Sequence, residues 1–153
     1  MTAPVTDFEV VFGKFLSALA LYNIMIAPTA FYVIFLKWVG SPDYGAIISS
    51  YIGLVLMGGL FISIGLLVSA ITKNQIVAAV IGIVALLILL VIGLASSGSE
   101  GALYNCLRYI GTYDHWETFT KGIIDSRDVV YYVSFTALLL FVVVRIVESR
   151  RWR

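Results

Sequence analysis

The sequence predicts an all-α integral membrane protein that forms a single membrane domain over residues 1–153. Hydrophobic residues make up 61% of the chain and charged residues only 12%, whereas soluble domains carry about 25% charged residues. The mean hydropathy is +1.01. Four stretches reach the roughly 20 apolar residues that a helix needs to cross a bilayer. The alternating ten-residue segments of a membrane barrel are absent from the sequence.

The N-terminal segment, residues 1–14, predicts a short helix at the membrane surface. Thr6 and Glu9 have the spacing of a capping box, and Val5 and Val10 fit the hydrophobic staple that accompanies it. An apolar face at helical spacing starts here and continues into the first span. Two interpretations are open: an ordinary interfacial lead-in, or a helix that a soluble partner pushes.

The transmembrane helices are predicted at residues 15–38, 47–71, 76–95 and 129–147. Pro28 removes a backbone hydrogen bond in the first of them, and Asn23 and Thr29 are close enough in sequence to satisfy the freed groups. The result is either a static kink or a gating hinge. The spans contain almost no ionisable residues, which argues against a proton-coupled carrier or an ion pump.

Small residues four apart occur in the second and third spans, where they allow helix backbones to approach closely. They pack either within one bundle or between two transporter halves. The pairs are Gly59 with Ser63, Gly65 with Ser69, and Ala78 with Gly82.

Lys and Arg near the span ends predict that both termini are cytoplasmic. In that orientation the external basic residues are Lys37, Arg108, Lys121 and Arg127. The internal ones outnumber them and are Lys14, Lys73, Arg145, Arg150, Arg151 and Arg153. Residues 148–153 then form a cytoplasmic basic tail, and residues 96–128 form an extracytoplasmic segment.

Within that external segment, residues 102–113 predict a helix in, or dipping into, the outer interface. The run from Asp114 to Glu117 contains His115 and resembles an acid–base cluster, but we interpret it as Trp116 anchored at headgroup level among solvated charges. Gly122 predicts a chain break, and Asp125 predicts the N-cap of the last helix.

No catalytic, cofactor-binding or metal-binding residues are predicted. A single cysteine, Cys106, excludes an internal disulfide and a cysteine-based metal cluster. The sequence has no phosphate-binding Gly-Lys-Ser/Thr loop, no Gly-x-Ser-x-Gly elbow and no His-Glu-x-x-His helix. No basic patch with interleaved aromatic residues indicates nucleic acid as a partner.

Several stretches resemble the ABC type-2 transporter permeases, near the branch associated with gliding motility. The stretches are residues 3–14, residues 69–79 (Ser-Ala-Ile-Thr-Lys-Asn-Gln-Ile-Val-Ala-Ala), residues 121–132 (Lys-Gly-Ile-Ile-Asp-Ser-Arg-Asp-Val-Val-Tyr-Tyr) and residues 148–153. They correspond to the C-terminal two-thirds of such a permease. The resemblance implies that two further helices and the front of the coupling region precede this part in a complete permease.

The resemblance also implies a location in the plasma membrane of a bacterial or archaeal cell, a second permease subunit and a pair of cytoplasmic ATPase subunits. The ATPase activity would belong to those partners, not to this chain. The segment before residue 15 and the connection at residues 72–75 would receive their motion. The implied coupling contacts are Thr6, Asp7, Phe8, Glu9, Val11, Lys14, Thr72, Lys73, Asn74 and Gln75. The cargo would be hydrophobic or amphipathic. The alternative is a non-transporting membrane scaffold or assembly partner.

Overall fold

The computed structural model describes residues 6–96 and 112–151, and all described secondary structure is helical. The elements are α1 (Asp7–Ile26), η1 (Ala27–Thr29), α2 (Ala30–Val39), α3 (Tyr44–Ile71), α4 (Gln75–Ser96), α6 (Thr112–Thr120) and α7 (Ser126–Arg151). Four helical segments are long and apolar enough to cross a membrane: Asp7–Val39, Tyr44–Ile71, Gln75–Gly93 and Ser126–Arg150. The all-α membrane fold predicted from the sequence is confirmed.

The first segment is one long rod. The helix that starts at Asp7 passes residue 14 without a break, so no helix end marks the predicted division between residues 1–14 and 15–38. At 1.5 Å per residue, Asp7–Val39 is about 50 Å long, against a hydrocarbon core of about 30 Å. One end of this rod therefore reaches beyond the core of the bilayer.

The predicted break at Pro28 is a single 3₁₀ turn, Ala27–Thr29. The N–H of Ala30 bonds to Ala27 instead of Ile26, and the Thr29 hydroxyl donates to the carbonyl of Ile26 at 2.6 Å. Asn23 donates to Leu19, not to the carbonyl that the proline leaves without its donor. Thr29 thus satisfies the Ile26 carbonyl that the 3₁₀ turn frees, and neither of the two predicted residues bonds to the carbonyl of Ile24, four residues before the proline.

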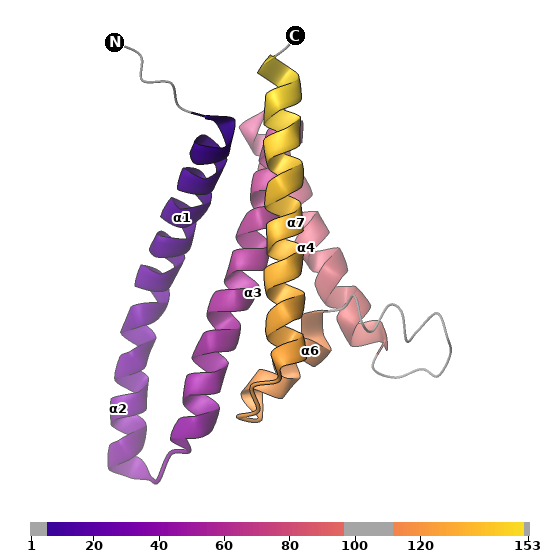
Figure 1. Ribbon diagram of the computed structural model, residues 1–153. Helices are drawn as coiled ribbons and strands as arrows, with labels where there is room; N and C mark the ends of the chain where they lie inside the picture. The colour runs from indigo at the N-terminus through magenta and orange to yellow at the C-terminus, as the bar shows by residue number, and fades with distance from the viewer. Residues whose placement is uncertain (1–5, 97–111, 152–153) are drawn as a thin grey trace.

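Helix α3 is the central helix and packs against α1, α4, α6 and α7. Figure 1 shows α7 beside α3 and the α1–α2 rod on the other side. The start of α1, the α3–α4 turn at residues 72–74 and the end of α7 lie at one end of the bundle, which we call the hairpin end. Helix α6 lies at the opposite end, which we call the α6 end.

Two clusters of buried side chains hold the bundle together. The cluster towards the α6 end contains Leu60, Phe119, Tyr131 and Tyr132. The cluster towards the hairpin end contains Val11, Val143 and Val144. The first cluster joins α7 to α3 and α6, and the second joins α7 to α1.

Of the small-residue pairs, the structure shows one packing within the bundle. Gly59 lies against the Phe15 and Leu19 side chains, and Ser63 is fully buried, so this pair packs within the bundle. A Cβ atom added at Gly65 or at Gly82 would meet no atom of another element within 4 Å, and Ser69 is exposed. Those positions therefore face away from the bundle.

Candidate functional site: the hairpin end

The N-terminal coupling segment begins with the predicted capping box. The Thr6 hydroxyl accepts from the Glu9 N–H at 3.3 Å, and the Glu9 carboxylate accepts from the Thr6 N–H at 2.8 Å. These reciprocal bonds satisfy two donors that a helix start leaves unpaired. The predicted staple depends on Val5, which lies outside the described residues.

The predicted contacts on this helix differ in exposure. Phe8 is 60% exposed and stacks on Phe12, with ring centroids 5.7 Å apart. Glu9 and Lys14 are exposed, and Asp7 is half-buried. Val11 is only 4% exposed and packs against Val143 and Val144. We therefore assign Val11 to packing between α1 and α7, because a contact with a partner needs accessible atoms.

The α3–α4 turn presents one charged side chain. Thr72 caps the end of α3, its hydroxyl donating to the Val68 carbonyl at 2.8 Å. Asn74 caps α4 by accepting from the Ile76 N–H at 3.0 Å. Gln75 is the first residue of α4. Lys73 is exposed between the two caps, so the caps fix the backbone that carries this ammonium group.

Helix α7 is joined to the same turn. The Arg150 guanidinium donates to the carbonyl of Ile71, the last residue of α3, at 2.5 Å. This bond occupies a carbonyl that the helix end leaves without an intrahelical donor. The end of α7 is thus tied to the end of α3 beside the turn.

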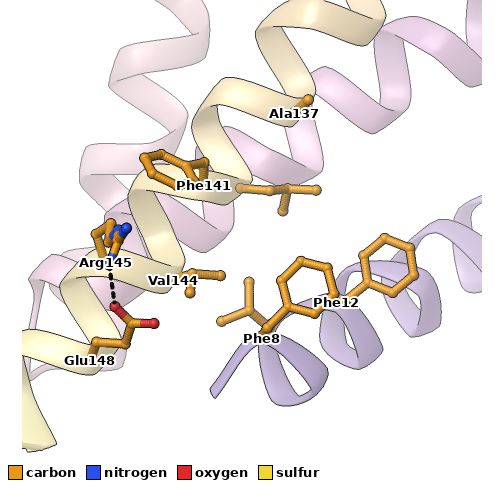
Figure 2. Close-up of a pocket in the computed structure, with 9 residues that line it drawn as sticks. Phe8, Phe12, Ala137, Phe141, Val144, Arg145 and Glu148 are labelled. Carbon is orange, nitrogen blue, oxygen red and sulfur yellow. Dashed lines mark hydrogen bonds and ion pairs between the residues drawn. The ribbon is translucent and has the colours of Figure 1, made fainter. Parts of the chain in front are cut away.

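An apolar cleft of about 500 Å³ separates α1 from α7 near the hairpin end. We call it the α1/α7 cleft. Figure 2 shows Phe8 and Phe12 on α1, Val144 of α7 pointing towards them, and Phe141 on the flank of α7 beside Arg145. The full lining is Phe8, Val11, Phe12, Ala137, Leu140, Phe141, Val144, Arg145 and Glu148. A second apolar cavity of about 260 Å³ shares Ala137 and Leu140 with it.

Arg145 and Glu148 supply the charges of the cleft. Their Nη1 and Oε2 atoms are 3.0 Å apart, and the side chains are 64% and 40% exposed. The guanidinium carbon also lies 5.1 Å from the centre of the Phe141 ring, within the range of a cation–π contact. In the sequence, Arg145 served only to predict the orientation of the chain in the membrane. The helical spacing of Phe141, Arg145 and Glu148 places them on one helix face and could have indicated a polar rim.

The α6 end holds a polar pair that the sequence interpretation missed. His115 and Asp128 are 8% and 6% exposed, and their Nδ1 and Oδ1 atoms are 2.6 Å apart. The His115 ring stacks on Tyr131 with centroids 4.1 Å apart. The prediction of solvated charges around an interfacial anchor is therefore wrong for His115.

The chain reversal between α6 and α7 brings this pair together. Gly122 has φ +79°, and the N–H groups of Gly122 and Ile123 bond back to Phe119 and Thr118, as in a Schellman cap. Asp125 then accepts from the Arg127 N–H at 2.9 Å as the predicted N-cap of α7. The chain break predicted at Gly122 and the N-cap predicted at Asp125 are both confirmed. Together they could have suggested that residues of α6 and of the start of α7 face each other.

The predicted interfacial helix at residues 102–113 falls almost entirely outside the described residues. Among the residues that the structure describes, no group of three or more His, Cys, Asp or Glu side chains could hold a metal ion. The buried His115–Asp128 pair joins α6 to α7 and thereby docks one helix on the other.

A family model described as ABC-2 family transporter protein matches residues 1–148. The chain belongs to this family. No curated protein and no solved structure matches it. As an ABC-2 family member, the chain is the membrane-spanning, non-catalytic component of an ABC transporter system. The family match thus agrees with the resemblance at the level of the permease.

Proposed function

We propose that this ABC-2 family chain is a transmembrane subunit of an ATP-driven exporter and receives the motion of a separate cytoplasmic ATPase at the hairpin end. One observation carries the proposal. The two segments that the resemblance implies as coupling contacts, residues 6–14 and 72–75, lie at the same end of the bundle although some 60 residues separate them. An ATPase surface could therefore push both at once.

The exposed polar groups at this end suit such a contact. Lys14 and Lys73 are exposed cations on two different elements, and the exposed Phe8 ring adds an apolar contact. The residues that hold the backbone, Thr6, Thr72 and Asn74, are used as caps. A firm backbone beneath exposed side chains is what transmission of a mechanical displacement requires.

The proposal also includes the orientation, the location, the second subunit and the cargo of the transporter. The hairpin end is cytoplasmic, with the α6 end outside, in the plasma membrane of a bacterial or archaeal cell. A second permease subunit completes the membrane assembly, and the cargo is hydrophobic or amphipathic. The relation to the gliding-motility branch rests on the resemblance of the sequence alone.

Cysteine crosslinking tests the proposed coupling surface. In a background with Cys106→Ser, Lys73→Cys and Lys14→Cys each introduce a thiol at an exposed position of the hairpin end. Ser41→Cys is the matched control, because Ser41 is exposed in the connection at the other end of the bundle. An ABC ATPase subunit is co-expressed in the same membranes, and a maleimide that carries a photoreactive benzophenone is attached to the introduced thiol and activated by light with and without ATP.

We expect adducts between the ATPase and the chain at Lys73→Cys and Lys14→Cys, with yields that change on ATP binding, and none at Ser41→Cys. If the ATPase co-purifies with the chain but neither hairpin-end thiol reacts with it, the coupling assignment is wrong. If no ATPase associates with the chain at all, a non-transporting scaffold becomes the better interpretation.

A further inference from the structure

The α1/α7 cleft has the dimensions and walls of a ligand site. Its volume of about 500 Å³ falls in the range of about 300–1,000 Å³ that is usual for small-molecule pockets. Phe8 and Phe12 line it from α1, Val144 points towards them from α7, and Phe141 lies on the flank of α7 beside Arg145 (Figure 2). The neighbouring cavity that shares Ala137 and Leu140 extends the apolar space towards Tyr132. An elongated hydrocarbon chain suits such a space.

The charged rim lies at the depth of lipid head groups. Between Asp128 and Arg145, helix α7 contains no ionisable group other than two tyrosines, so its apolar run ends at Arg145. A helix needs about 20 residues to cross the hydrocarbon core. Arg145 and Glu148 are the first charged side chains after this run, as expected of groups at the boundary between hydrocarbon and water, and they line the cleft together with Phe8.

The rim is dipolar rather than cationic. Arg145 offers N–H donors that match a phosphate group, and Glu148 offers carboxylate acceptors that match an ammonium group. Their mutual ion pair is exposed, and exposed ion pairs contribute little to stability. The pair can therefore open around a ligand at little cost when the ligand supplies an opposite charge to each side chain.

We propose that the α1/α7 cleft binds a phospholipid whose head group carries a phosphate and a primary ammonium, with the phosphate on Arg145, the ammonium on Glu148 and an acyl chain along the apolar lining that Phe8, Phe12 and Val144 form. A phosphocholine head has the same net charge but no N–H donor for Glu148. A phosphoglycerol head has no cation and places its phosphate charge near the Glu148 carboxylate. The site therefore distinguishes three common heads by their chemistry.

This lipid site goes beyond the proposed coupling function and is tested without an ATPase. The full chain is purified in detergent and mixed with equimolar phosphatidylethanolamine, phosphatidylcholine and phosphatidylglycerol of identical acyl chains. Native mass spectrometry then measures which lipids stay bound. The variants are Glu148→Gln and Arg145→Gln, which change exposed side chains, and the matched control is Glu117→Gln, which breaks an exposed ion pair at the α6 end.

We expect the natural chain to retain phosphatidylethanolamine about threefold to fivefold over the other two lipids, and Glu148→Gln to abolish that preference. Arg145→Gln should reduce retention of all three lipids by about fivefold. Glu117→Gln should change neither the amount of lipid retained nor the preference among the three lipids. Equal retention of the three lipids by the natural chain, a preference for another head, or an unchanged preference in Glu148→Gln would each overturn the proposal. Failure of the crosslinking with a positive lipid result would reject only the coupling assignment.

Discussion

Replacement of His115 by alanine gives the sharpest test of how α6 is held. The imidazole is paired with the carboxylate of Asp128, which is 6% exposed, and the two bonded atoms are 2.6 Å apart. Removal of the hydrogen-bond partner of a buried side chain costs about 1–3 kcal/mol, since the remaining polar group is left unsatisfied. Loss of the stacking on Tyr131 adds about 0.5–1.5 kcal/mol. Together these two losses give an expected net cost of about 3 kcal/mol.

Two measurements check this loss. Denaturant unfolding of the purified chain in detergent gives the change in the free energy of unfolding, and hydrogen exchange locates it. We expect the amides of α6 to exchange faster, with the middle of α3 little changed, because the pair joins α6 to α7. Asp128→Asn keeps an acceptor for the imidazole and should lose about 1 kcal/mol.

Lys121→Gln is the control on the same side of the bundle. It breaks the Glu117–Lys121 pair, whose side chains are 46% and 61% exposed, and such pairs contribute at most about 1 kcal/mol. If His115→Ala loses no more stability than Lys121→Gln, or if α6 exchange does not change, then the buried pair does not hold α6 and the reasoning fails.

Glycine substitutions give two further predictions, each read by the same unfolding assay. A Cβ at Gly58 would overlap the Tyr22 ring, so Gly58→Ala should destabilise the chain by about 1–3 kcal/mol. At Gly65 an added Cβ meets no atom within 4 Å, so Gly65→Ala should be neutral or stabilising by up to about 1 kcal/mol. Equal effects at the two sites would contradict the packing of α1 on α3. Gly122→Ala should cost about 1–3 kcal/mol, because φ is +79° there and the added Cβ would lie 3.2 Å from the Ala46 backbone; a neutral result would contradict the left-handed cap.

Local chemistry made several features predictable. The capping box of Thr6 and Glu9 is visible in the sequence because its partners are three residues apart. The same holds for the cap at Asp125 and the break at Gly122. The transmembrane helices follow from runs of apolar residues, since a bilayer requires a minimum length of helix. Residues 1–5, 97–111 and 152–153, which include part of the predicted external segment, lie outside what the structure describes.

The sequence by itself determined that this chain is a helical membrane protein, where the caps at Thr6 and Asp125 lie, and the family to which its order of motifs points. Only the tertiary structure decided that Val11 is a packing residue, that His115 meets Asp128 inside the protein, and that a cleft with a dipolar rim opens between α1 and α7. The physical reason is the distance along the sequence over which each feature is determined. Caps and spans depend on neighbours within a few residues, whereas burial and clefts depend on which distant helix packs alongside, and an apolar side chain looks the same in sequence whether it faces lipid or another helix.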